Sequence, residues 1–290
     1  MLRKSFLIIS SLFFIASTIN AQTVIAKYAG EFMALGVGGR ALGMGGAFVA
    51  VANDVTSGYY NPAGLANLNY PQIALMHSEQ FGNLVNYDYG TVAIPFQNDM
   101  SFGVSAMRLG VDGIPDTRNA LYDANGDGII DINDDRLDYS RITEFSNQDW
   151  AFYLTFAKRQ TEDFYWGVNA KIIRRDLAEF GATGIGFDVG AYYIPVENLF
   201  LGANLQDATT TLIAWSTGRN ELVSPTLKIG AAYKLAEFLG GYIMPALDFD
   251  IRFENRQFAS NFNLGPVSFD MHAGFEYTFR NLIYIRGGYN

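Results

Sequence analysis

Residues 123–134 place oxygen-bearing side chains at the spacing of a twelve-residue calcium loop. Such loops use side-chain oxygens at positions 1, 3, 5, 9 and 12, a main-chain carbonyl at position 7 and glycine at position 6. Position 12 is an aspartate in place of the usual bidentate glutamate, so we expect weaker binding or altered geometry. The predicted calcium ligands are the side chains of Asp123, Asn125, Asp127, Asp131 and Asp134 and the carbonyl of Ile129. The alternative is an acidic, glycine-rich surface turn without an ion.

A second set of ionisable residues alternates with apolar ones along two predicted strands, 242–255 and 264–279. Its members are Asp248, Asp250, Arg252, Glu254, Asp270, His272 and Glu276. Carboxylates beside a histidine could serve acid–base catalysis. If these strands cross a membrane, however, the charged face cannot meet lipid, where a basic residue costs about 2–4 kcal/mol near the midplane. We therefore expect an ion-paired lumen wall.

Composition and motifs exclude several classes of function. Cysteine is absent, which removes disulfides, thiolate metal sites and cysteine nucleophiles. The net charge of −9 and the absence of a basic run argue against nucleic-acid binding. Neither G-x-S-x-G nor H-E-x-x-H occurs. We predict no catalytic residues and no enzymatic activity.

The segment 36–67 is rich in glycine and alanine, which let backbones approach closely. No phosphate-binding glycine motif occurs between residues 36 and 46, so packing is the better interpretation. We predict an N-terminal plug over residues 22–70. Its predicted motif residues are Gly39, Arg40, Gly43, Gly45, Gly46, Asn61, Pro62 and Ala63. Pro62 fixes φ and favours a kinked exit from the plug, while a contact to a ligand beneath the plug is the alternative.

From residue 71 onward, apolar and polar residues alternate as in β-strands. We predict eleven strands, at 72–80, 85–96, 100–110, 148–160, 164–176, 183–195, 199–209, 224–235, 242–255, 264–279 and 282–289. The long connections, 111–147 and 210–223, follow odd strands, while even strands end in short turns. This asymmetry is typical of an outer-membrane barrel with external loops. The predicted fold is therefore an all-β, transmembrane antiparallel barrel over residues 71–290.

The first 21 residues read as a secretory signal peptide. Arg3 and Lys4 form a charged start, an apolar run follows from residue 6 to 16, and Ala21 ends a plausible cleavage site. No other segment has about 18 consecutive apolar residues, the length needed for a membrane helix. We therefore predict the outer membrane of a Gram-negative-type bacterium, with its lipid as a partner.

Two stretches carry a family resemblance, GRALGMGGAF at 39–48 and NPAGL at 61–65. They resemble PorV/PorQ proteins, a branch of the FadL-like outer-membrane barrels. Weaker matches occur at 205–209, 215–218, 225–230, 274–277 and 285–289. FadL-like barrels have fourteen strands, so the resemblance implies a chain truncated at its C-terminus.

The resemblance also implies a function. It suggests a non-enzymatic component of type IX protein secretion or cell-surface attachment, with secretion components and secreted cargo as partners. The alternative is a FadL-like channel for the transport of hydrophobic small molecules. A purely structural or adhesive surface protein is a third possibility.

Overall fold

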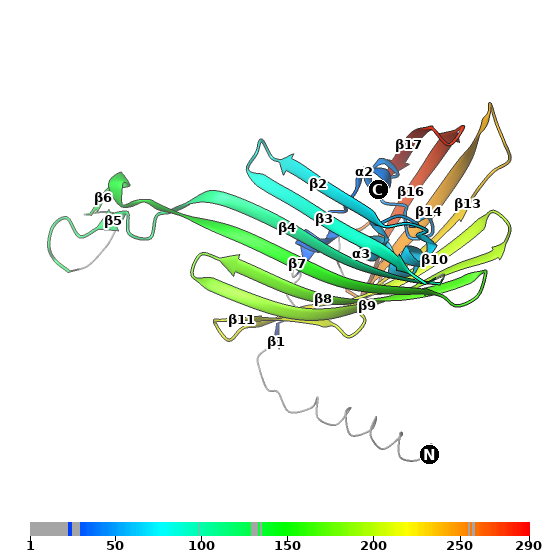
Figure 1. Ribbon diagram of the computed structural model, residues 1–290. Coiled ribbons are helices and arrows are strands. Elements are labelled where there is room, and N and C mark those ends of the chain that lie inside the picture. The colour runs from blue at the N-terminus through cyan, green and yellow to red at the C-terminus, as the bar shows by residue number, and fades with distance from the viewer. Residues whose placement is uncertain are drawn as a thin grey trace, which may run out of the picture.

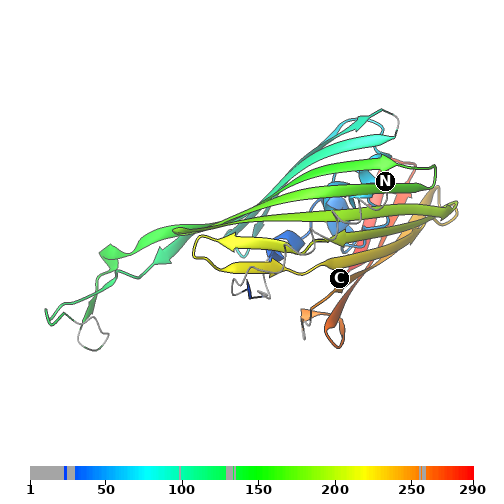
Figure 2. The same ribbon diagram turned by 90° about the horizontal axis from the view of Figure 1, so that it is seen from below.

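The computed structural model describes residues 23–24, 30–97, 99–128, 133, 135–254, 256 and 259–290. The predicted signal peptide lies outside these residues. Most of the described chain forms one curved antiparallel sheet, shown in Figures 1 and 2. Its long strands are β2 (Gln72–Gln80), β3 (Val85–Phe96), β4 (Met100–Asp116), β7 (Thr143–Arg159), β8 (Phe164–Leu177), β9 (Phe180–Val196), β10 (Leu199–Gln206), β13 (Thr226–Tyr233), β14 (Gly241–Arg252), β16 (Val267–Phe279) and β17 (Ile283–Tyr289).

Each long strand coincides with one predicted strand, which confirms the predicted all-β antiparallel fold. Each pairs with its neighbour along the chain, apart from short strands inserted between them. The sheet does not close among the described residues, since β2 pairs only with β3 and β17 only with β16.

The connections divide the sheet into two ends. Turns at 97–99, 160–163, 197–198, 234–240 and 280–282 form the short-turn end. The last of these places Arg280 and Asn281 at positive φ, as a type I′ hairpin turn requires. The opposite, long-connection end carries the connections at 81–84, 117–142, 178–179, 207–225 and 253–266.

The two long connections, in which we predicted no strand, do contain strands. β4 and β7 run on as a hairpin beyond the predicted strand ends, and β5 (Leu121–Tyr122), β6 (Arg136–Leu137) and the 3-10 turn η3 (Tyr139–Arg141) lie at its tip. We call the described part of residues 111–147 the arm, and Figure 1 shows it projecting away from the sheet. The other connection forms a hairpin of β11 (Thr211–Trp215) and β12 (Asn220–Val223). β15 (Phe262–Leu264) is a short strand beside β16.

Residues 30–70, which we call the inner segment, lie against the concave face of the sheet (Figure 1). They contain η1 (Glu31–Ala34), α2 (Gly39–Gly43), α3 (Ser57–Tyr60) and η2 (Pro62–Asn67). Their buried side chains, among them Phe48, Tyr60 and Leu65, form the apolar cores together with residues from the strands. None of the helices in the described part of the chain has the length and apolar character needed to span a lipid bilayer.

Candidate functional site: the inner face of the sheet and the inner segment

The inner face of the sheet is polar although it is buried. The strand residues with the least exposure include many polar and charged ones. Examples are Ser105, Thr155, Asn169, Lys171, Asp188, Asn204, Asp248, Asp250, Glu276 and Thr278. Buried polar groups are costly unless they are hydrogen-bonded or paired, so this face requires partners, and the inner segment supplies several of them.

The outer face shows the opposite polarity. Leu154 on β7 is 60% exposed, and Ile172 and Ile185 on the next two strands are 52% and 58% exposed. The register places Phe152 beside Ile172, and Ile172 beside Ile185, so apolar side chains form a continuous band across neighbouring strands. Further exposed apolar residues extend this band to other strands, including Leu75, Ile94, Val104, Val189, Leu247 and Phe275.

Two glycines of the sheet let the inner segment lie directly on the backbone. Gly167 of β8 and Gly190 of β9 are register partners beneath Pro62. A Cβ on Gly167 would approach the carbonyl carbon of Pro62 to 2.5 Å, and a Cβ on Gly190 would approach the Pro62 Cδ atom to 2.8 Å. Any larger residue at either position would push the inner segment off the sheet.

Asn61, beside this contact, is completely buried and joins three parts of the chain. Its Nδ2 group donates to the carbonyls of Val49, at 3.0 Å, and of Ala191 on β9, at 2.9 Å. Its Oδ1 atom accepts the N–H of Ala63 at 3.2 Å, which caps η2. The predicted Asn61–Ala63 motif thus lies at the contact between the inner segment and the sheet, with Pro62 at the start of η2.

The inner segment is also held by carboxylates of the sheet. Asp248 of β14 accepts the backbone N–H groups of Phe48 and Val49 at 2.6 and 2.7 Å. Glu276 of β16 receives Arg40 of α2 at 2.9 Å and Arg286 of β17 at 2.6 Å. Arg40 also lies 3.2 Å from Asp54 of the inner segment, so it is bound between the sheet and its own segment.

Three of the predicted motif glycines lie near the same strands, whereas a Cβ on Gly39, in α2, would meet no atom within 4 Å. Gly43 lies beside Arg286, and Gly45 and Gly46 lie against β17 and His272. The His272 Nδ1 atom is 3.1 Å from the Gly45 carbonyl oxygen.

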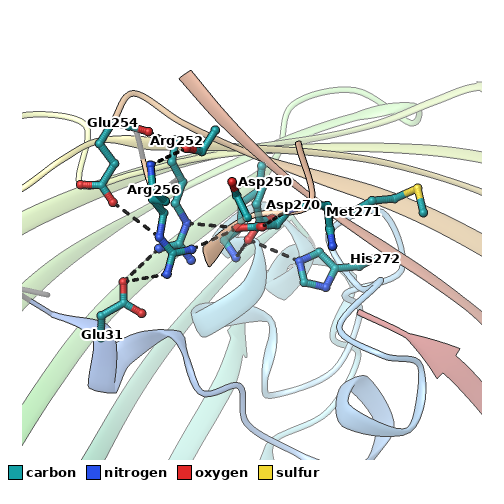
Figure 3. A network of polar contacts seen from close by, with 12 residues as sticks. Glu31, Asp250, Arg252, Glu254, Arg256, Asp270, Met271 and His272 are labelled. Atoms are coloured by element: carbon teal, nitrogen blue, oxygen red, sulfur yellow. Dashed lines mark hydrogen bonds and ion pairs between the residues drawn. The ribbon is translucent and has the colours of Figure 1, made fainter. Parts of the chain in front are cut away.

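The remaining predicted charged residues form a network at the long-connection end, drawn in Figure 3. Glu31 of η1 lies 3.3 Å from both Arg252 and Arg256, and Asp270 lies 3.2 Å from Arg256. Glu254 pairs with Arg256 at 3.8 Å. Deeper inside, Asp250 binds Lys228 at 2.5 Å and lies 3.6 Å from His272. Arg256, Lys228 and Glu31 were not among the predicted site residues, because nothing in the sequence distinguishes them from other charged residues.

A hollow of about 390 Å³ lies between the inner segment and strands β14 and β16. Its wall combines Tyr59 and Tyr60 of α3 with charged residues of this network, among them Arg252 and Asp270. Leu35 and Leu42 add apolar surface. The Tyr59 hydroxyl donates to the Met33 carbonyl at 2.6 Å and the Tyr60 hydroxyl to the Val37 carbonyl at 2.9 Å.

The sequence analysis also missed a buried ion cluster, which joins β8 and β9 to the residue after β10. The Lys171 ammonium lies 2.7 Å from both Asp188 and Asp207, and all three residues are buried. Asn169 donates to Asp188 at 3.0 Å and to the Gly58 carbonyl of the inner segment at 2.7 Å. In the sequence, Lys171 alternates onto the same polar face of its strand as Asn169, and this pattern could have indicated that Lys171 points inward.

The structure describes only some of the calcium ligands predicted from sequence. The Asp123 carboxylate accepts the N–H groups of Gly126 and Gly128 at 2.5 and 2.8 Å, and Asn125 accepts the N–H of Asp127 at 2.9 Å. Ile129, Asp131 and Asp134 lie outside the described residues. No cluster of three potential metal-ligating side chains occurs within the part of the chain that the structure describes.

The arm contacts the sheet through an ion pair near its base. Arg118 lies 2.6 Å from Glu179 in the turn between β8 and β9. The hydrogen bond from Arg118 lowers the pKa of Glu179, so this carboxylate stays charged to lower pH than usual.

The comparisons with known proteins place the chain only coarsely. A model of the "Uncharacterised protein family (UPF0164)" matches residues 9–111, about a third of the chain, which include the whole inner segment. None of the curated proteins compared is similar to this chain.

Two solved structures are similar in shape. A FadL homologue of Pseudomonas aeruginosa is 10% identical with a TM-score of 0.49, over 86% of this chain and 77% of that one. OmpT, an outer membrane protein of Vibrio cholerae, is 11% identical with a TM-score of 0.40, over 79% and 69%. At these values neither protein's function transfers to this chain.

Proposed function

We propose that the chain is a β-barrel protein of the outer membrane. The observation that carries the proposal is the inverted polarity of its sheet, with buried charges inside and exposed Leu, Ile, Val and Phe side chains outside. Soluble proteins rarely expose an apolar area of this extent, whereas lipid requires it. We infer a non-enzymatic role, because the ionisable groups described above on the inner face are engaged by one another or by backbone groups.

Within this class, we propose a protein of the PorV/PorQ type that serves type IX protein secretion or cell-surface attachment. The support is the resemblance at residues 39–48 and 61–65, together with what these residues do. They form the part of the inner segment that binds the sheet through Arg40, Phe48 and Asn61. Secretion components and secreted cargo would then be its partners.

The hollow supports a second candidate, a FadL-like channel for hydrophobic small molecules. Its volume of about 390 Å³ lies in the range of small-molecule sites. Its many charged wall residues favour a ligand with a polar end over a purely apolar one.

Purification in mild detergent distinguishes these two functions. For the secretion protein, we expect other secretion components or cargo to co-purify, identified by mass spectrometry. Stoichiometric lipid or fatty acid in the purified protein, without protein partners, would instead support the channel.

The orientation of the barrel gives a direct test of its membrane topology. The natural chain has no cysteine, so single cysteines report their own accessibility. We expect Tyr139→Cys and Thr217→Cys, at the long-connection end, to react with an impermeant maleimide on whole cells. Asp163→Cys and Glu197→Cys, at the short-turn end, should react only after lysis. Labelling of the second pair on intact cells would contradict the proposed orientation.

We also propose that residues 123–134 bind calcium. Without a cation, the acidic side chains of residues 123–134 repel one another, and calcium would remove this repulsion. Calcium should therefore protect the arm from protease added to whole cells, and Asp127→Ala should abolish the protection while the barrel stays in the membrane. Equal cleavage of the natural protein in calcium and in chelator would leave only a solvated acidic turn.

A further inference from the structure

The β11–β12 hairpin branches from β9, outside the main strand order of the sheet. β11 pairs with β9 and β12, while β12 pairs with β11 and with β1 (Thr23–Val24) and has no other strand neighbour in the described sheet. Figure 2 shows this hairpin with β1 beside it. β1 runs parallel to β12, with Thr23 opposite Asn220 and Val24 opposite Glu221.

The strands of the main sheet on the other side of β12 do not pair with it. β10 pairs with β13 up to the partners Gln206 and Thr226, and β13 then pairs with β14, not with β12. A small cavity of about 60 Å³ lies there, with Gly30, Leu222 and Arg252 among its lining residues. The sheet is thus interrupted between β12 and β13.

The hydrogen-bond pattern of the hairpin shows which groups of the far edge of β12 are available. The Trp215 N–H donates to the Arg219 carbonyl at 2.9 Å, and bonded and non-bonded pairs alternate along an antiparallel ladder. The N–H and C=O groups of Asn220 and Leu222 therefore point away from β11. In a parallel ladder, the residue opposite Glu221 bonds to both of these neighbours, and this residue is Val24.

The occupant of this edge is short. β1 has two residues and β12 has four. A backbone hydrogen bond contributes only modestly to stability, so a longer extended segment that pairs along all of β12 would compete with β1. Unpaired strand edges accept such segments readily, and they recognise mainly the backbone of the added strand.

We propose that β12 is a strand-acceptor site for an extended segment of a secreted protein, kept occupied by the chain's own Thr23–Val24 until the partner strand replaces it. That the partner is a secreted protein rests on the proposed function, because the proposed function places the long-connection end outside the cell. Backbone pairing suits a component that handles many different cargo sequences.

The test uses the purified full-length protein in detergent and, as probe, a fluorescent peptide with the sequence of residues 22–30. In the natural protein, the tethered β1 competes at a high effective concentration, so the peptide should bind weakly. Val24→Pro removes the N–H that β1 donates, and we expect it to raise peptide affinity at least tenfold. Adding Leu222→Pro removes an N–H of the acceptor edge and should abolish this binding, whereas adding Leu222→Ala should preserve it.

Folding of the Leu222→Pro protein is checked by a disulfide between Ala214→Cys and Asn220→Cys, which are paired across the hairpin. If this disulfide forms and the peptide still binds to Val24→Pro/Leu222→Pro, the proposal that β12 is the acceptor strand is wrong. Unchanged affinity in Val24→Pro would equally overturn it. Neither result depends on secretion, so both leave the proposed membrane function to its own tests.

Discussion

Lys171→Met should destabilise the protein by about 3–5 kcal/mol, the cost of removing one partner from a buried ion pair. Lys171 is the cation described between Asp188 and Asp207, at 2.7 Å from each. Methionine has similar volume but leaves the two carboxylates close together without a positive charge. Urea unfolding of the protein in lipid vesicles, followed by tryptophan fluorescence, measures the change in free energy of unfolding.

The matched control lies three residues further along β8. Arg174 forms an ion pair with Asp176, but both side chains are about half exposed. Exposed pairs contribute about 0–1 kcal/mol, so Arg174→Met should have little effect. Adding Asp188→Asn to Lys171→Met should recover part of the lost stability, because one unpaired charge disappears. Equal costs for Lys171→Met and Arg174→Met would show that the cluster is hydrated.

The strands of the sheet could be predicted because apolar side chains on one face and polar ones on the other impose a two-residue period. The prediction failed where this constraint ends. The β4–β7 hairpin continues past a register shift between Val111 and Ile114, where Gly113 has a φ of 68°. Such a bulge breaks the alternation, so the arm lacked a strand pattern in the sequence.

The short hairpin was missed for a different reason. β11 and β12 have only five and four residues, too few for alternation to be distinguished from an irregular loop. Their strand form depends on β9, which pairs with β11 from a distant part of the chain.

The sequence indicated several individual residues of the site, but it did not indicate which residues contact one another. Alternation marked Asp248 and Glu276 as one polar face, and the structure shows what they bind, the backbone of Phe48 and Val49 and the side chain of Arg40. These contacts join residues about 200 positions or more apart in the sequence. No local pattern encodes such pairs, and the same holds for Lys171 with Asp207.

Leu154→Arg tests the membrane placement itself. Leu154 lies on the outer face of β7, between Val104 of β4 and Ala170 of β8, and is 60% exposed. If this face meets lipid, the arginine should cost about 2–4 kcal/mol in a vesicle unfolding experiment and reduce the heat-modifiable, folded band on gels. Glu162→Arg, in the exposed turn after β7, is the control and should change stability by no more than about 0.5 kcal/mol. If the outer face met water instead, both arginines would be tolerated equally, because an exposed charge on a hydrated strand loses no solvation. A large difference between the two variants is therefore expected only when the apolar band of the sheet lies in a bilayer.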